Sequence, residues 1–353
     1  MPSALRPLPR RTFGLAALAT AVALSASACG PETSGSSSVG AAPAASAPLA
    51  TSVPKGTVLR IADQNRLLES ILHAAGQDQD FPYEVEYEAF QGGPAVLEAF
   101  RAGEADAGFV SDAPVVFAQA HDQDVKITGV VQNSPDATHL WTAPESDVRE
   151  LAGLKGKKIA YTEGTTFQAA VLNALGKAGL SADDVTLVKL SDPSQIPAAL
   201  ASGQVDAGTL TEPLVTKYAT VYEKKGAHEV AGDTGLTSGL QFVIAPGDAL
   251  ADRATSAALA DLSTRFTKAE LWLAAHKEAW VEEYYVKVQK VDRATGQAVV
   301  ANNGTPSIPT YAKAAAALQD VADVLAAGGA IDKLDVSKSF DNRFDAVQQG
   351  AAK

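Results

Sequence analysis

A repeated motif, present in two separate segments, constrains the fold of this chain most strongly. The segment from Val96 to Pro114 reads VLEAFRAGEADAGFVSDAP, and the segment from Ile196 to Pro213 reads IPAALASGQVDAGTLTEP. Each predicts the end of an amphipathic helix, a glycine turn, a short buried strand and a polar residue after that strand. Open α/β sheets bind ligands at the carboxyl ends of their strands. The repeat therefore predicts two α/β lobes that each present a polar loop, although two unrelated helix–strand turns would give the same pattern.

Four positions of the repeat carry identical residues, and a fifth carries an acid in both copies. The matched residues are Gly103, Asp106, Ala107, Gly108 and Asp112 in the first copy and Gly203, Asp206, Ala207, Gly208 and Glu212 in the second. Because Asp112 and Glu212 both follow the predicted strands, we expect them at the mouths of the two lobes.

The length and charge of the chain limit its class. Its 353 residues leave room for two domains with a full hydrophobic core. A composition of 46% hydrophobic and 20% charged residues is typical of a soluble α/β protein. The net charge of −12, without a cluster of lysine or arginine in the body of the chain, argues against a nucleic-acid partner.

The amino terminus has the pattern of an export signal. Arg6, Arg10 and Arg11 precede an uncharged run that is shorter than the roughly 20 apolar residues of a membrane-spanning helix. The run ends in Ala-Ser-Ala-Cys-Gly, which is similar to a bacterial lipoprotein cleavage box, and the arginine pair is similar to a twin-arginine motif. We expect residues 1–28 to be a lipoprotein signal peptide and Cys29 to be lipidated, so that the protein is exported and anchored to the outer face of the cell membrane. A signal peptide with an incidental cysteine is the alternative.

Cys29 is the only cysteine of the sequence. An internal disulfide is therefore impossible, and after lipidation no thiol remains for nucleophilic chemistry. The residues that follow, 29–56, are rich in serine, alanine, proline and glycine and have no periodic apolar face. This composition predicts a flexible tether.

The rest of the chain divides into an alternating part and a helical part. Predicted strands alternate with single helices up to about residue 245, which indicates βαβ units and mostly parallel sheets, and from Ala249 the pattern becomes helical. We expect the first lobe to comprise residues 57–142 and 243–353, including the C-terminal helices, and the second to comprise 143–242. The aromatic residues of the helical part are interpreted as core packing.

The sequence offers little for catalysis or metal binding. None of its five histidines is spaced with another as metal ligands are, and it has no phosphate-binding loop and no Gly-x-Ser-x-Gly elbow. We therefore expect no catalytic residue, no metal and no cofactor. What remains are polar loops after strands, where glycines followed by hydroxyl residues at a helix start favour an anion. Each of these taken alone also fits an ordinary helix N-cap.

Several of these segments resemble the aliphatic sulfonate-binding proteins of ABC importers. The resemblance lies in residues 92–100, 105–108 and 111–120, and it extends to Leu59-Arg60-Ile61 with Gln64 and to residues 154–160 with Gly164-Thr165. The same motifs occur in the wider group that binds taurine, nitrate and thiamine-precursor pyrimidines. The resemblance implies an α/β, type II periplasmic-binding-protein fold, with two α/β lobes, two crossover strands and a ligand cleft between the lobes.

The resemblance also implies a set of ligand-binding residues and partners. Carried over by position, the cleft residues are Gln64, Gly93, Ser111, Asp112, Gly164, Thr165, Thr166, Thr211, Glu212 and Gln241, and the crossovers are Trp141 to Ala143 and Phe242 to Ile244. A protein of this kind acts as a monomer that carries a small-molecule solute, such as a sulfonate or a taurine-like compound, to an ABC permease with its ATPase.

Departures from the family leave the ligand open. Asp63 stands where these proteins often have a tyrosine, and Thr211-Glu212 where they often have an aromatic residue and an aspartate. The site loops thus hold several carboxylates and only Arg66 as a nearby cation, and a simple sulfonate would be costly to bury beside them. A zwitterion such as taurine fits better, and a pyrimidine precursor, a nitrate-like anion or an amine are alternatives. A sensor lipoprotein is a further alternative, whereas the desulfinase type of enzyme on this fold needs a cysteine nucleophile.

Overall fold

The computed structural model describes residues 48–353. The expected signal peptide, Cys29 and most of the expected tether lie outside the described residues. Residues 48–56, the end of the expected tether, contain no helix or strand. Two side chains in this stretch, Leu49 and Val53, nevertheless pack against the core of the folded body.

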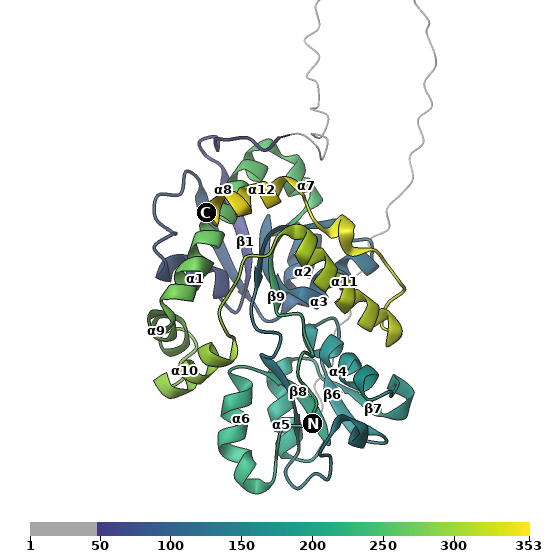
Figure 1. Ribbon diagram of the computed structural model, residues 1–353. Coiled ribbons are helices and arrows are strands. Elements are labelled where there is room, and N and C mark those ends of the chain that lie inside the picture. Colours follow the sequence, from purple (N-terminus) through teal and green to yellow (C-terminus); the bar gives the residue numbers. More distant parts are fainter. Residues whose placement is uncertain (1–47) are drawn as a thin grey trace, which may run out of the picture. The chain divides into compact units, whose positions relative to one another are not determined.

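Two separate β-sheets organise the described residues (Figure 1). The first sheet has the order β2-β1-β3-β9-β4, with β1 (Val58–Gln64), β2 (Glu84–Phe90), β3 (Ala107–Ser111), β4 (Val125–Gln132) and β9 (Leu240–Pro246). The second has the order β5-β8-β6-β7, with β5 (Thr138–Thr142), β6 (Lys158–Tyr161), β7 (Thr186–Lys189) and β8 (Ala207–Thr211). We call each sheet with its helices the first and the second lobe.

The direction of each strand follows from how the chain reaches it. Strands linked by helices within a lobe are parallel, as the sequence predicts for β1, β2 and β3 and for β6, β7 and β8. The strands through which the chain enters from the other lobe are antiparallel to their neighbours, namely β5 beside β8 and β9 between β3 and β4. Each sheet is therefore mixed, with one reversed strand at the point of entry.

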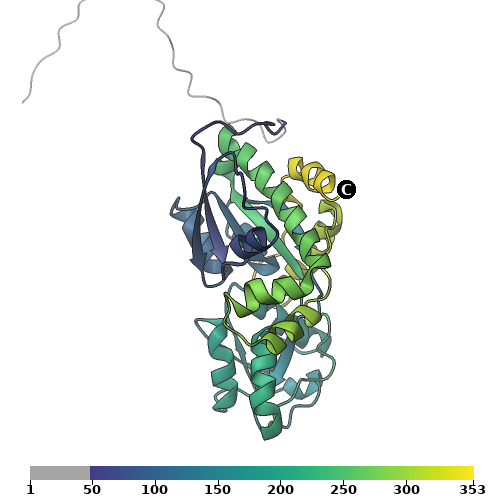
Figure 2. The ribbon, with the colours of Figure 1, turned by 90° about the vertical axis from the view of Figure 1, so that its left-hand side faces the viewer.

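Helices cover both sheets (Figures 1 and 2). Those of the first lobe are α1 (Leu67–Ala74), α2 (Gly93–Arg101), α3 (Asp112–Ala120), α7 (Gly247–Ala251), α8 (Arg253–Ala275), α11 (Tyr311–Ala327) and α12 (Arg343–Ala351), and those of the second are α4 (Thr166–Lys177), α5 (Ile196–Ala201) and α6 (Leu214–Tyr222). After α8 follow α9 (Lys277–Trp280), a π-helical turn (Val281–Val286) and α10 (Arg293–Asn302). Helix α8 packs on α1, α12 and β4, whereas α11 contacts α3 of one lobe and α4 of the other. Among the helices in the described part, none combines the length and the apolar character needed to cross a membrane.

The repeated motif builds the same local structure in both lobes. The carboxylate of Asp106 accepts the backbone N–H of Arg60 at 3.0 Å, and that of Asp206 accepts the backbone N–H of Lys158 at 2.8 Å. Each aspartate thus ties its own strand, β3 or β8, to the start of the neighbouring parallel strand. A Cβ on Gly108 would lie 2.6 Å from Val96 Cγ1, so this glycine lets helix α2 approach the sheet closely.

The structure moves both expected lobe boundaries. Strand β5 pairs with β8, so it belongs to the second lobe rather than the first, and Leu240, Gln241 and Phe242 belong to β9 of the first lobe. The chain crosses in residues 133–137 and 234–239, not at Trp141–Ala143 and Phe242–Ile244. The two crossing segments are bonded to each other, because Thr237 Oγ1 donates to the carbonyl of Pro135 at 3.1 Å. An apolar strand pattern identifies a strand but not the sheet it joins, which explains the difference.

Candidate functional site

A cavity of about 270 Å³ lies where loops of the two lobes meet. Its wall contains the carboxyl ends of three strands: Gln64 of β1, Ser111 of β3 and Thr211 of β8. Thr166 contributes the first turn of α4, and Gln241 contributes the start of β9. The location agrees with the expectation that polar loops after strands converge at one site.

Seven of the ten expected site residues line this cavity, and three do not. The seven are Gln64, Ser111, Asp112, Thr166, Thr211, Glu212 and Gln241. Gly93 instead allows close packing, because a Cβ there would lie 2.2 Å from Pro114 Cγ. Thr165 caps helix α4 by accepting the N–H of Phe167 at 3.2 Å, and Gly164 takes a φ of +73° in the preceding turn. These three residues shape the backbone next to the cavity and are not among the described residues that line it.

Asp112 uses both carboxylate oxygens for protein hydrogen bonds. It is 1% exposed, and its Oδ1 accepts the hydroxyl of Thr166 at 2.7 Å and its neighbouring Ala113 N–H at 2.7 Å. Its Oδ2 accepts the hydroxyl and the N–H of Ser238 on the returning crossing segment. Asp112 therefore connects the first lobe, the start of α4 in the second lobe and the crossing segment.

Glu212, the counterpart of Asp112 in the repeat, has a different environment. Its carboxylate accepts the hydroxyl of Thr216 at 2.9 Å and the N–H of the same residue at 3.2 Å, so it caps the start of α6. It also accepts the side-chain amide of Asn302, at the end of α10, at 2.6 Å. The sequence repeat thus matches the two acids in position but not in burial or in partners.

The helical segment after β9 supplies a wall that the sequence did not indicate. Trp280, Tyr284 and Tyr285 are buried and line the cavity, and the rings of Trp280 and Tyr284 stack with centroids 4.7 Å apart. They therefore form part of the core, as expected, and of the cavity wall as well. Glu270 of α8 lines the same cavity at 6% exposure. Burial raises the pKa of Glu270 to about 8.

A sequence signal for Glu270 does exist. The apolar stripe of α8 includes Phe266 and Leu273, and Glu270 follows Phe266 by one helical turn, on the side that faces the core. A glutamate on the buried side of a helix is rare unless it is paired or faces a cavity. This position is therefore the one that a search for polar residues within apolar stripes would have found.

The charges around the cavity are one-sided. Its wall includes the carboxyl groups of Asp112, Glu212 and Glu270, while no lysine, arginine or histidine is among the described residues that line it. Arg66, the cation expected nearby, instead places its Nε 3.0 Å from Glu69 Oε2, and its side chain is more than half exposed. The donors available to a ligand are thus neutral amides, hydroxyls and backbone N–H groups.

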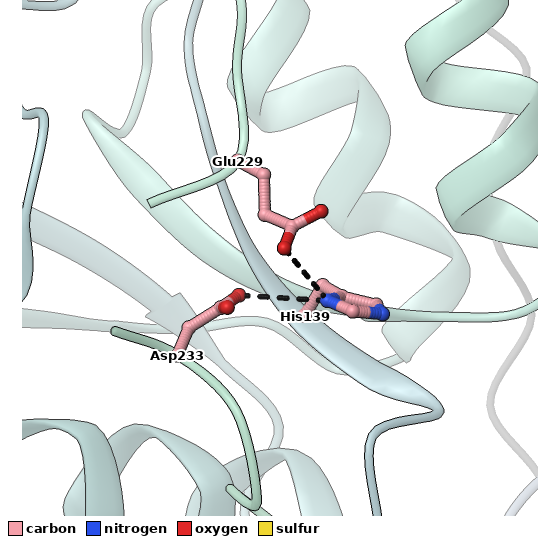
Figure 3. A group of neighbouring side chains, drawn as sticks. All are labelled: His139, Glu229 and Asp233. Atoms are coloured by element: carbon pink, nitrogen blue, oxygen red, sulfur yellow. Dashed lines mark ion pairs between the residues drawn. The ribbon is translucent and has the colours of Figure 1, made fainter. Parts of the chain in front are cut away.

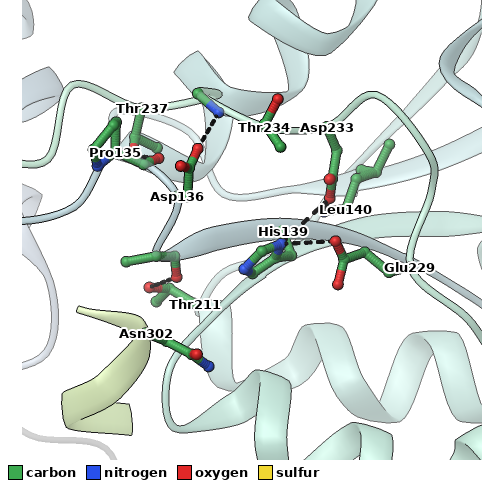
Figure 4. A network of polar contacts seen from close by, with 12 residues as sticks. Pro135, Asp136, His139, Leu140, Thr211, Glu229, Asp233, Thr234, Thr237 and Asn302 are labelled. Carbon is green, nitrogen blue, oxygen red and sulfur yellow. Dashed lines mark hydrogen bonds and ion pairs between the residues drawn. The ribbon is translucent and has the colours of Figure 1, made fainter. Parts of the chain in front are cut away.

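A second polar cluster lies on the second lobe; its residues do not line the cavity, although Thr138, next to His139, does (Figures 3 and 4). His139 Nδ1 is 3.2 Å from Glu229 Oε1 and 3.7 Å from Asp233 Oδ2, and one ligating atom from each of the three residues lies within 4.8 Å of the others. Asp233 is 2% exposed and accepts the N–H of Leu140 at 2.6 Å. The hydrogen bond between His139 and Asp233, and then the charge of Glu229, raise the pKa of His139. The sequence spacing did not reveal this group, because β5 and the loop after α6 bring it together.

Comparisons with known proteins agree with this geometry. A family model described as an ABC transporter, phosphonate, periplasmic substrate-binding protein matches residues 71–294. A putative aliphatic sulfonates-binding protein of Bacillus subtilis (strain 168) is 29% identical over 265 residues, which are 74% of this chain and 77% of that protein. A protein of the same description from Escherichia coli (strain K12) is 30% identical over 190 residues; the match covers 53% of this chain and 58% of that protein, just over half its length.

A solved structure shows the same architecture. The alkanesulfonate-binding protein SsuA from Xanthomonas axonopodis pv. citri, bound to MOPS, is 28% identical with a TM-score of 0.70, over 81% of this chain and 99% of that protein. The likeness confirms the expected periplasmic-binding-protein fold with two α/β lobes.

Proposed function

Because this chain belongs to the family of phosphonate-type periplasmic substrate-binding proteins of ABC transporters, we propose that it captures a small sulfonate or taurine-like solute for an ABC importer. The observation that carries the proposal is the cavity between the lobes, lined by Gln64, Ser111 and Thr211 at the ends of strands from both sheets. The sulfonate class is supported by the relatives in Escherichia coli and Bacillus subtilis, which are both described as putative aliphatic sulfonates-binding proteins. The cavity volume of about 270 Å³ suits a solute of a few carbon atoms.

The solute is held without chemical change. The desulfinase type of chemistry needs a cysteine nucleophile, and the single cysteine of the chain is Cys29 in the lipoprotein-like cleavage box. The polar groups that line the cavity are amides, hydroxyls and carboxyls, and the carboxylates of Asp112 and Glu212 already accept hydrogen bonds from protein. They suit recognition of a solute better than covalent catalysis.

Delivery takes place outside the cytoplasm. Cys29 becomes the lipidated first residue, and the tether that follows holds the folded body near the membrane, where the permease and its ATPase receive the solute. A Cys29→Ala variant should lose membrane association in a cell-fractionation assay and keep its ligand affinity in solution. Lost affinity together with retained membrane association would contradict both the anchor and the tether.

A thermal-shift screen tests the function directly. The Cys29→Ala protein, from residue 29 onward, is melted with taurine, short alkanesulfonates, sulfate, nitrate, simple amines and thiamine-type pyrimidines. A ligand at about 100 times its dissociation constant stabilises the folded state by roughly 2.7 kcal/mol, which a melt detects. Stabilisation by a sulfonate or by taurine supports the proposal. Stabilisation by nitrate or a pyrimidine alone keeps the importer and removes the sulfonate, and no stabilisation after removal of co-purified ligand contradicts the proposed ligand class.

A further inference from the structure

Glu270 is the one acid of the cavity wall whose carboxyl group is left for a ligand. Within residues 48–353, Asp112 and Glu212 each accept hydrogen bonds from neighbouring side chains or backbone, whereas Glu270 has no hydrogen bond or ion pair. It is nonetheless 6% exposed and lines the cavity. Three carboxyl groups in one cavity thus divide into two that hold the protein together and one that is unpaired.

An unpaired buried carboxyl group destabilises the folded state. Buried polar groups are normally hydrogen-bonded, and an exception calls for a reason such as a ligand. A helix residue that served only to fill space would be apolar here, as its neighbours Phe266 and Leu273 are. The position is therefore better explained by a partner that arrives with the solute.

A second unpaired acceptor lies in the same cavity. Gln64 Oε1 is buried and has no hydrogen-bond partner among the described residues. Gln64 Oε1 and the ionised carboxylate of Glu270 are two acceptors without donors, and they call for a ligand that brings N–H groups. The aromatic rings of Trp280 and Tyr284 share the wall, and such rings attract cations at close range.

We propose that the solute carries an ammonium group, which binds at Glu270, so that its class is a short aminoalkanesulfonate. The sulfonate end of this assignment rests on the proposed function, while the ammonium end rests on Glu270, Gln64 and the absence of a basic residue among the described residues that line the cavity. The sulfonate is met by neutral donors such as the side-chain amide of Gln241, whose oxygen accepts the amide N–H of Asn133 at 3.0 Å and whose own amide N–H groups make no protein hydrogen bond among the described residues.

The proposal predicts the sign of the pH dependence. Burial raises the pKa of Glu270 to about 8, so the free protein holds a proton there at neutral pH. An ammonium group binds the ionised form and displaces that proton, so affinity rises between about pH 6 and pH 8. Burial, then the charge of Glu212 and, to a smaller extent, that of Glu270 raise the pKa of Tyr285 on the π-helical turn well above this range. A solute without the ammonium group would bind more weakly as Glu270 ionises.

The test uses two solutes that differ in one group. Taurine and isethionate are 2-aminoethanesulfonate and 2-hydroxyethanesulfonate, and their affinities are measured by calorimetry for the wild type, Glu270→Gln and the control Glu283→Gln. Glu283 lies on the π-helical turn after α8, does not line the cavity, and pairs with Lys287 at 2.7 Å. We expect the wild type and the control to prefer taurine by about tenfold or more, and Glu270→Gln to lose that preference without losing isethionate.

The outcomes separate this inference from the proposed function. Equal affinity for both sulfonates, unchanged by Glu270→Gln, overturns the ammonium site and leaves the sulfonate importer standing. Binding of propylamine, dependent on Glu270 and without binding of either sulfonate, supports the ammonium site and overturns the sulfonate. No binding of any of these compounds overturns both. If Glu270→Gln fails to fold, calorimetry of the wild type with taurine in buffers of different ionisation enthalpy decides: proton release supports the site, and no release or uptake overturns it.

Discussion

The hydroxyl of Thr166 donates to the carboxylate of Asp112 across 2.7 Å, which joins the first turn of α4 in the second lobe to the start of α3 in the first. Ser111 Oγ lies 2.8 Å from the same hydroxyl, and Ser238 of the crossing segment donates to the other oxygen of Asp112. The lobes therefore meet through protein hydrogen bonds at the edge of the cavity. A solute that enters or leaves the cavity must either break this hydrogen-bonded contact or pass it while it stays intact.

Replacing Thr166 by valine keeps the side-chain shape and removes its hydroxyl. Because Asp112 is 1% exposed and would lose a donor, we expect a loss of about 1–3 kcal/mol in the free energy of unfolding, measured by urea denaturation. Thr216→Val is the matched control, since the hydroxyl of Thr216, in α6, makes a similar bond to Glu212 within the second lobe. If Thr166→Val is as stable as the wild type and Thr216→Val is not, the contact between lobes contributes nothing to stability.

Gly93, which the family resemblance places in the site, and Gly176, which it does not, should respond to alanine in opposite directions. A Cβ at Gly93 would lie 2.2 Å from Pro114 Cγ, a ring that cannot swing away, so Gly93→Ala should lower the free energy of unfolding by roughly 1–3 kcal/mol. Gly176 in helix α4 has open space around it and a helical backbone, so Gly176→Ala should raise that free energy by about 0.5–1 kcal/mol. Thermal melts of both variants check the pair. A Gly93→Ala protein of normal stability but lost affinity would return Gly93 to the ligand-contact role.

Glu270 makes stability depend on pH in a predictable direction. The folded-state pKa of about 8 lies above the ordinary value of 4.5, so the folded protein holds more protons than the unfolded chain between these limits. Stability therefore falls as pH rises from about 4.5 to 8, by roughly 3–5 kcal/mol in total. Glu270→Gln removes this fall, and its melting temperature should exceed that of the wild type most clearly at pH 8. Parallel pH profiles for the two proteins would show that Glu270 is ionised or paired in the folded state.

More of the fold than of the candidate site could be predicted from the sequence. The repeated motif predicted two α/β lobes because Asp106 and Asp206 perform the same local task, a bond from carboxylate to neighbouring strand. Local patterns of this kind can be recognised in an amino-acid sequence. The sheet that β5 joins could not be predicted, because strand pairing depends on contacts between residues distant in sequence. For the same reason, Asp112 and Glu212 looked equivalent, although their partners come from different lobes.

The residues of the cavity wall, too, could be predicted from the sequence only in part. Gln64, Ser111 and Thr211 were predicted because each ends a strand, and such positions converge by geometry. Glu270 was missed because it lies inside a helix pattern whose apolar stripe is otherwise regular. Whether a polar residue on that stripe is paired or open to a cavity depends on the whole packing.

The cluster of His139 gives the last prediction. The raised pKa of His139, caused by Asp233 and then by Glu229, means that the folded state binds its proton more tightly than the unfolded chain does. The resulting stability is fully present below about pH 6.5 and is lost as pH rises through the higher folded-state pKa. His139→Gln should therefore cost roughly 1 kcal/mol at pH 5.5, a small value because water screens the partly exposed Glu229. The cost should be smaller at pH 8.5, because more of His139 has lost its proton there. Thermal melts at both pH values measure this, with His276→Gln, an exposed histidine at the end of α8, as the control. Melts with added Zn²⁺ distinguish the alternative: stabilisation by zinc that His139→Gln abolishes would make the three residues a metal site, whereas an ion pair leaves the melting temperature unchanged by zinc.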